Sequence, residues 1–167
     1  MPKPPSKPTI TADLRPATDD DVAAVATIWH DGWRDGHLGH VPEALLAVRT
    51  RESFRTRAAE RVADTTVAVA GDRIAGFVMV ADDEAEQVYV AADHRGAGIA
   101  ALLLAEAERI IAGHGHRRAW LAVVAGNERA RRFYQRSGWT DEGPFEYAAA
   151  TADGTIPVPA HRYAKAV

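Results

Sequence analysis

A glycine-containing loop between a strand-like segment and a helix-like segment is the feature that most restricts how this chain can fold. The loop reads Arg-Gly-Ala-Gly over residues 95–98, follows the strand-like run 87–90 and precedes a long apolar helical pattern over residues 99–111. Glycine has no Cβ, so the loop can adopt positive φ and bring backbone N–H groups close to a ligand. The first N–H groups of the helix are unpaired and carry partial positive charge. This arrangement predicts a diphosphate site.

The same loop also fits a plain strand-to-helix turn, in which a glycine serves only close packing. Two other phosphate-binding motifs are excluded. A dinucleotide-binding fingerprint needs a third small residue and an acidic residue about 20 positions later. A P-loop needs Gly-Lys-Ser/Thr at the start of the helix. Neither pattern is present, so the loop alone leaves a diphosphate site and a plain turn as alternatives.

A second motif lies further along the chain. Residues 127–139 read Asn-Glu-Arg-Ala-Arg-Arg-Phe-Tyr-Gln-Arg-Ser-Gly-Trp and follow a buried-strand run at residues 120–124. Together with the loop they resemble the GNAT acetyltransferase superfamily, whose members combine an Arg-Gly-x-Gly loop with a helix reading Asn-x-x-Ala-x-x-Phe-Tyr-x-x-x-Gly-Phe. The resemblance is specific over residues 84–139. It departs at Trp139, where the family has Phe, and at Ala91-Ala92, where a proline often precedes the loop.

The resemblance implies a fold and a co-substrate. The fold would be the α+β GNAT acyl-CoA N-acyltransferase fold, a mixed and mostly antiparallel sheet flanked by helices, with splayed central parallel strands. Acetyl-CoA would lie between those strands, where an amide-rich pantetheine can satisfy free backbone groups as an added strand does. The residues implied in binding it are Val88, Tyr89, Val90, Arg95, Gly96, Ala97, Gly98, Ile99, Ala100, Ala101, Asn127 and Tyr134.

Acetyl transfer to an amine requires a base for the ammonium, a donor for the oxyanion and a proton for the departing thiolate. By resemblance Tyr134 is the general acid, the alternative being that it only packs beside Phe133. For the base we favour Glu86, with Glu84 second; the two lie on one face of a strand, and solvent-facing charges are the alternative. A backbone N–H at Val90 or its neighbour would meet the oxyanion.

Two further residues of the implied site have ordinary alternatives. Asn127 stands at the start of a helix, so its side chain could cap that helix, bind pantetheine, or do both. Arg95 would lie beside the phosphates, and a surface ion pair is its alternative.

The acceptor end of the site is only weakly specified. Trp33 and His37 are the candidate substrate contacts, although for Trp29 and Trp33, at i, i+4 spacing, a place in the core of the protein is favoured. His37 and His40 have no acidic or third histidine partner nearby, so we expect no metal. The pair His114 and His116 follows a helix and is expected only to favour its dipole.

Length and composition fit one ordinary domain. The 167 residues are 47% hydrophobic and 26% charged, which predicts a single domain over residues 10–167 after a proline-rich flexible tail, residues 1–9. Cysteine is absent, which excludes disulfides, thiolate zinc sites and a cysteine nucleophile. A net charge of −3 and the lack of an apolar signal favour a cytoplasmic enzyme with no nucleic-acid or membrane partner. Whether two copies of the chain form a homodimer is left open by the sequence.

Hydrophobic periodicity and turn residues predict an alternating series of elements. Helices are expected from residue 19 to 36, from Pro42, from Thr50 or Ser53 to about residue 63, and over 99–114 and 127–137. Strands are expected over 10–15, 66–70, 74–80, 84–90, 119–124, 139–148 and 158–164, and we expect the last two to be joined by a loop of more than two residues around Asp153-Gly154.

Together these patterns predict an N-acetyltransferase that moves an acetyl group from acetyl-CoA to a primary amine. We expect direct transfer in a ternary complex, because no nucleophile for an acyl-enzyme stands out. A small-molecule acceptor is favoured. The alternatives are a protein or peptide amine, or a non-catalytic module that binds acyl-CoA as a sensor.

Overall fold

The computed structural model describes Pro2 and residues 11–167. Apart from Pro2, the predicted tail over residues 1–9 lies outside the described residues, as does Ile10, the first residue of the predicted first strand. Residues 11 and 12 are described but are not in a strand, and the predicted strand corresponds to the short β1, Asp13–Pro16.

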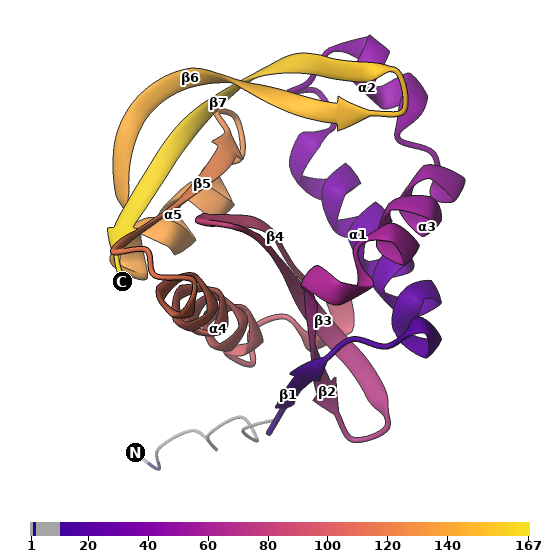
Figure 1. Ribbon diagram of the computed structural model, residues 1–167, viewed down its shortest axis with the longest axis vertical. Coiled ribbons are helices and arrows are strands. Elements are labelled where there is room, and N and C mark those ends of the chain that lie inside the picture. Colours follow the sequence, from indigo (N-terminus) through magenta and orange to yellow (C-terminus); the bar gives the residue numbers. More distant parts are fainter. Residues whose placement is uncertain (1, 3–10) are drawn as a thin grey trace.

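The described chain forms one seven-stranded sheet with helices on both faces (Figure 1). The strand order is β1-β2-β3-β4-β5-β7-β6, and every neighbouring pair is antiparallel except β4 and β5, which run parallel. This confirms the predicted α+β class. The strands after β1 are β2 (Thr65–Ala70), β3 (Arg73–Ala81), β4 (Glu84–Val90), β5 (Arg118–Val124), β6 (Thr140–Thr151) and β7 (Gly154–Ala166).

Helices α1 (Val22–His37), α2 (Glu43–Val48) and α3 (Arg51–Glu60) lie on one side of the sheet, and α4 (Ile99–Gly113) and α5 (Glu128–Arg136) lie on the other (Figure 1). Short 3-10 turns, η1 (Asp19–Asp21), η2 (Val62–Asp64) and η3 (Ala92–His94), connect them. Of the two predicted starts for the third helix, the structure has Thr50: its side chain accepts a hydrogen bond from the Ser53 N–H at 3.1 Å.

The parallel strands β4 and β5 meet only where they begin. Glu84 pairs with Trp120, and the Trp120 N–H donates to the Asp83 carbonyl at 3.1 Å. Within the described chain no further residues of the two strands are paired. β4 also carries a bulge, because Met79 of β3 opposes Gln87 whereas Val80 opposes Ala85, which leaves Glu86 as the extra residue. Bulges bend strands, and this one lies where β4 leaves β5.

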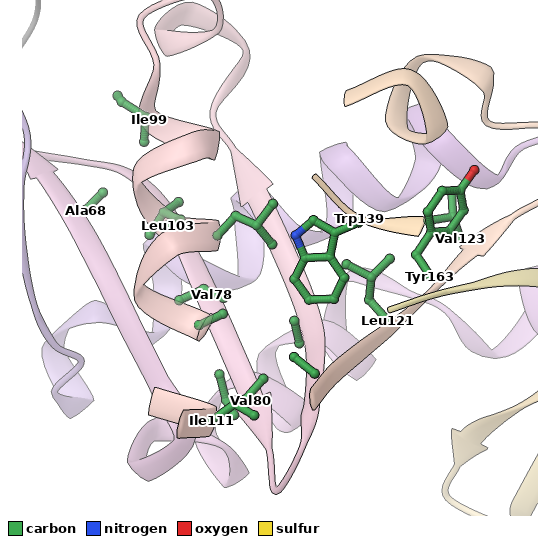
Figure 2. Packing of buried hydrophobic residues seen from close by; sticks show 14 of the residues in the cluster. Ala68, Val78, Val80, Ile99, Leu103, Ile111, Leu121, Val123, Trp139 and Tyr163 are labelled. Carbon is green, nitrogen blue, oxygen red and sulfur yellow. The ribbon is translucent and has the colours of Figure 1, made fainter. Parts of the chain in front are cut away.

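Two apolar cores hold the layers together. The first lies under α4, where Ile99, Leu103 and Ile111 pack on Val78 and Val80 of β3 (Figure 2). The second lies under α1 and α3 and includes Trp29 and Trp33, which are 0% and 5% exposed. The core alternative for these two tryptophans is therefore confirmed, although Trp33 also reaches the cavity described below.

The hairpin β6–β7 differs from the prediction. Its strands are longer than expected, and only Ala152 and Asp153 connect them. β5 ends at Val124, opposite Ala160, so beyond that point β7 pairs with β6 alone. A proline is tolerated on such an open edge because its missing N–H breaks no ladder bond there. This explains how β7 runs through Pro157 and Pro159.

The two histidines after α4 also do more than the sequence predicted. His114 Nδ1 lies 2.9 Å from the Asp82 carbonyl oxygen, and His116 Nε2 lies 2.7 Å from a carboxylate oxygen of Asp82. They hold the β3–β4 turn, in which Asp82 has a φ of 53°. The expectation that they act only on the helix dipole was wrong, because this turn is remote from them in sequence.

Close contact between α1 and β4 depends on Gly32. A Cβ built there would lie 2.4 Å from Cδ1 of the Tyr89 ring. We expect Gly32→Ala to destabilise the fold by about 1–3 kcal/mol, because the crowded ring or helix must shift. Gly113→Ala is the matched control: it meets nothing within 4 Å and is expected to gain up to about 1 kcal/mol. Urea unfolding measures both, and equal stability changes would contradict the contact.

Candidate active site

A cavity of about 390 Å³ lies beside the diverging ends of β4 and β5. Residues of α1, α2 and α3 line one side of it, and residues of α5 and the β6–β7 hairpin line the other. The structure thus brings together predicted site residues that are far apart in sequence, namely Trp33, His37, Glu84, Glu86, Val88, Tyr89, Asn127 and Tyr134. Val90 and residues 95–101 are not part of this lining.

The glycine loop has the backbone that a diphosphate site requires. Gly96 and Gly98 have φ values of 82° and 81°, and Gly98 is the N-cap of α4. A Cβ on either glycine would meet nothing within 4 Å, so the space beside the loop is open. The Ile99 side chain is buried in the core at 2% exposure, and only its backbone is available to a ligand. The loop and the unpaired N–H groups of α4 therefore fit a diphosphate.

Arg95 forms the ion pair that was its alternative role. Its Nη2 donates to a carboxylate oxygen of Asp35 on α1 at 2.9 Å, and 29% of the Arg95 side chain is exposed. The pair joins the glycine loop to α1.

The strand residues predicted to bind the pantetheine have side chains that are already engaged. Val88 and Val90 pack against the core under α4, and the Tyr89 ring packs against Phe77. These side chains are half-buried and already have partners within the protein. Because β4 pairs with β5 only at Glu84, the backbone of the later part of β4 is the part that a ligand can reach.

Asn127 caps α5. Its Oδ1 accepts a hydrogen bond from the Ala130 N–H at 3.2 Å, which confirms the capping role. The amide nitrogen Nδ2 points toward the end of α1, where a Cβ on Gly36 would lie 2.8 Å from it. Asn127 also lines the cavity.

Tyr134 lies on α5 with its ring against those of Phe133 and Tyr163, at centroid distances of 5.2 and 6.1 Å. The described residues offer its hydroxyl no hydrogen bond, and the residue lines the cavity. Burial raises the pKa of this phenol to about 12. It therefore keeps its proton at neutral pH.

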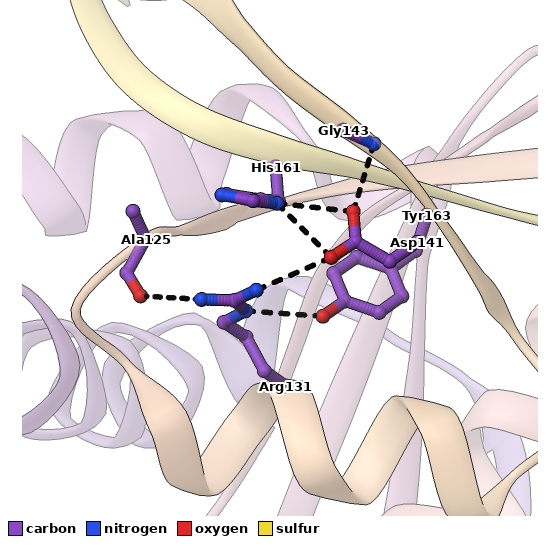
Figure 3. Close-up of polar contacts among 6 residues, drawn as sticks. All are labelled: Ala125, Arg131, Asp141, Gly143, His161 and Tyr163. Carbon is purple, nitrogen blue, oxygen red and sulfur yellow. Dashed lines mark hydrogen bonds and ion pairs between the residues drawn. The ribbon is translucent and has the colours of Figure 1, made fainter.

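A polar network holds α5 in place (Figure 3). The Arg131 guanidinium donates to the Ala125 carbonyl at 3.1 Å, to the Tyr163 hydroxyl at 3.1 Å and to Asp141 at 3.2 Å. Asp141 also accepts from His161 Nδ1 at 3.0 Å and lies on β6. One arginine of α5 is thus tied to β6, β7 and the loop after β5, which fixes where Tyr134 stands.

The two carboxylates on β4 have different surroundings. Glu84 accepts a hydrogen bond from the Tyr147 hydroxyl at 2.7 Å. Burial, together with the negative charges of Glu86 and Asp83, raises the pKa of Glu84 to about 7 despite that bond. Glu86 instead accepts a hydrogen bond from Arg61 Nη1 at 2.8 Å, with its side chain 15% exposed. Glu84 is thus poised to take up a proton near neutral pH, whereas Glu86 is held in an ion pair.

The candidate substrate residues Trp33 and His37 are stacked, with ring centroids 4.7 Å apart and planes 9° apart. His37 Nδ1 lies 2.8 Å from the Trp33 carbonyl oxygen. Burial lowers the pKa of His37 to about 4. The imidazole is therefore neutral at physiological pH and adds no charge to the cavity.

Four charged or aromatic residues of the cavity lining were not predicted, namely Arg49, Arg57, Arg61 and Tyr147. A signal for two of them exists in the sequence. Arg57 and Arg61 stand at i+3 and i+7 from Phe54, on the stripe that α3 buries. A charged residue on a buried stripe is unusual and points to a site. For Tyr147 no local pattern exists, because its partner Glu84 is 63 positions away.

These features define a class of protein. A parallel strand pair that separates beside a cavity, next to a glycine loop at a helix N-terminus, is the arrangement expected of an acyl-CoA-dependent transferase. The model of the acetyltransferase (GNAT) family matches residues 24–139. The chain belongs to this family of acetyl-CoA-dependent N-acetyltransferases, and it is an enzyme of that kind.

Solved structures share the fold at low sequence identity. The GCN5-related N-acetyltransferase from Rhodopseudomonas palustris is 17% identical, with a TM-score of 0.74 over 97% of this chain and 99% of that chain. PaiA N-acetyltransferase from Thermoplasma acidophilum, in complex with coenzyme A, is 17% identical, with a TM-score of 0.69 over 94% and 99%. YncA from Salmonella typhimurium, with acetyl-CoA, is 15% identical, with a TM-score of 0.67 over 93% and 94%.

No curated protein matches the chain. In the part of the chain that the structure describes, the helices are too short or too polar to cross a membrane.

Proposed function

We propose that this enzyme transfers the acetyl group of acetyl-CoA to the primary amine of a small molecule, directly and within a ternary complex. The observation that carries the proposal is that one cavity is lined by two groups with opposite proton roles. Glu84, with a pKa of about 7, can accept a proton, and Tyr134, with a pKa of about 12, can donate one. A base and an acid are what amine acetylation needs from its enzyme.

In this proposal Glu84 removes a proton from the substrate ammonium, directly or through a water. The amine nitrogen then forms a bond to the acetyl carbon, and the carbon–sulfur bond breaks. Tyr134 gives its proton to the departing sulfur, and a backbone N–H at Val90 or its neighbour stabilises the oxyanion. Glu84 is preferred to Glu86 as the base because the Arg61 ion pair occupies the Glu86 carboxylate. Acetyl-CoA supplies the thioester, and the glycine loop would hold its diphosphate.

The size of the cavity supports a small acceptor. Its volume of about 390 Å³ is in the lower part of the usual range for small-molecule sites, about 300–1,000 Å³. The Arg49 guanidinium donates to the Ala150 carbonyl at 2.6 Å, which ties α2 to the tip of the β6–β7 hairpin. This contact joins two of the segments that line the cavity.

An amine panel tests the proposal. Acetyl-CoA is supplied with small primary amines and with short peptides, released CoA thiol is measured, and acetylated products are identified by mass spectrometry. We expect acetylated small amines and intersecting double-reciprocal plots, as for a ternary complex. Parallel plots would indicate an acyl-enzyme. Acetylation of peptides alone would favour a protein acceptor, and binding of acetyl-CoA without any acetylation would favour a sensor.

The loop makes a separate prediction about acetyl-CoA. Gly98→Val should weaken binding at least about tenfold, because a β-branched residue is strained at a φ of 81° and would fill the open space beside the loop. Gly96→Asp should act similarly through its negative charge. Gly115→Val is the control, since Gly115 has a φ of 92° at the other end of α4. Unchanged affinity of the Gly98 variant by calorimetry would refute the placement.

A further inference from the structure

Two arginines in the acceptor half of the cavity lack acidic partners. Arg49 is 5% exposed; its Nη2 donates to the Ala150 carbonyl, and its buried Nε has no hydrogen-bond partner. Arg57 lies over the Trp29 ring, 4.3 Å from the centroid, and its buried Nη1 is also without a partner. Both line the cavity. Buried donors are nearly always hydrogen-bonded, so these two point to a missing acceptor.

The acidic groups of the cavity do not supply that acceptor. Arg61 forms an ion pair with Glu86, and it also donates a hydrogen bond to Asp64 at 2.9 Å. Glu84 is bound by Tyr147 and is only partly ionised at neutral pH. Among the described residues, neither Arg49 nor Arg57 forms an ion pair. Two positive charges therefore remain uncompensated at this end of the cavity.

The pKa of Arg57 agrees with this concentration of positive charge. Burial, together with the positive charge of Arg49, lowers its pKa to about 10. Arg57 still carries its charge at neutral pH. Holding two guanidinium groups near each other and away from water is costly unless an anion joins them.

Acetyl-CoA itself is not the expected anion. Its diphosphate is assigned to the glycine loop at residues 96–98, at the opposite end of β4 from the bulge at Glu86. Arg49 directly follows α2 and Arg57 lies on α3, and both helices are on the other side of the sheet from α4. The arginine nearest the loop is Arg95, and it is paired with Asp35.

We infer that the acceptor amine also carries an oxyanion group, as an amino acid does, and that Arg49 and Arg57 bind this group. The inference rests on the proposed function and names its substrate class. Guanidinium groups present parallel N–H donors that match the two oxygens of a carboxylate, and they also suit a phosphorus oxyacid. With the oxyanion held by the arginines, the amine of the same molecule is left to face Glu84.

Matched acceptors test the inference. Free α-amino acids, their carboxamides and their aminophosphonate counterparts are compared as acceptors, with rates corrected for the fraction of free amine. We expect kcat/KM for the best amino acid to exceed that of its carboxamide by about 10- to 100-fold, the range for charge-assisted hydrogen bonds. The aminophosphonates show whether a carboxylate or a phosphorus oxyacid is preferred.

Arginine variants show whether these two residues cause the preference. In Arg57→Gln the acid-to-carboxamide ratio should fall by about 10-fold or more, mainly through KM, and Arg57→Lys should restore part of it. Arg109→Gln on α4, an exposed arginine paired with Glu106, should leave the ratio unchanged. Acetyl-CoA affinity, measured by calorimetry, shows whether each variant is folded. If Arg57→Gln does not fold, Arg49→Gln provides a second test.

The outcomes separate this inference from the proposed function. Equal use of acids and carboxamides, or a ratio that Arg57→Gln does not change, would overturn the inference and leave the acetyltransferase proposal intact. If no amine is acetylated, the proposed function fails, and calorimetric titration of amino acids into the complex with CoA decides the inference without turnover. Absence of binding there would overturn it as well.

Discussion

Glu84→Gln is expected to lower kcat/KM at pH 7.5 by about 10²- to 10⁴-fold, the usual contribution of a general base. Glutamine can still accept the Tyr147 hydrogen bond but cannot take up the substrate proton. In the wild-type enzyme kcat/KM should rise with pH through about 7, where Glu84 loses its proton, and the variant should lack this rise. Initial rates between pH 5.5 and 9 measure both effects.

Although it lowers activity, Glu84→Gln should raise the stability of the protein at alkaline pH. The folded state raises the pKa of Glu84 from its ordinary value of 4.5 to about 7, so it favours the protonated carboxyl. The stability that this group contributes is present below about pH 4.5 and is lost as pH rises through 7. Glu84→Gln should therefore raise Tm at pH 8 and change it little at pH 4.5. A loss of activity together with a gain in stability would not be produced by simple misfolding.

Glu86→Gln is the matched control, because Glu86 stands two positions away and lines the same cavity. It breaks the Arg61 ion pair and should reduce the rate by less than about tenfold. The rise of kcat/KM with pH should remain but move below pH 7, because the negative charge of Glu86 helps to raise the pKa of Glu84. If Glu86→Gln abolished that rise and Glu84→Gln did not, Glu86 would be the base, in the order that the sequence alone favoured.

Tyr134→Phe is expected to lower kcat by about 10²- to 10³-fold while leaving acetyl-CoA affinity unchanged. Only the hydroxyl is removed, and it has no hydrogen-bond partner among the described residues. The ring keeps its contacts with Phe133 and Tyr163, so the free energy of unfolding should hardly change. Stopped-flow acetyl transfer, calorimetry and urea unfolding make the three measurements.

Two other results would give Tyr134 a different role. A parallel loss of acetyl-CoA affinity and stability would make it a packing residue, the alternative that the sequence left open. An unchanged kcat would mean that solvent protonates the sulfur. A non-catalytic sensor would have no rate to lose.

Much of the cofactor half could be predicted because its signals are local. β4 occupies residues 84–90 as predicted, and α4 begins at Ile99 directly after the glycine loop. Apolar periodicity and the freedom of glycine at positive φ act over a few residues, so a single stretch of chain contains them. The β6–β7 hairpin was predicted less well, because the two prolines in β7 are acceptable only where β5 has already ended.

The sequence by itself determined the glycine loop, the strands that meet it and the family to which the chain belongs. Only the tertiary structure decided that the pKa of Glu84 beside Tyr147 is raised to about 7, that Glu86 is paired with Arg61, and that two buried arginines have no acidic partner. The backbone conformation that a residue prefers depends mainly on that residue itself. A proton affinity or an uncompensated charge depends on burial and on neighbours that folding brings from distant parts of the chain.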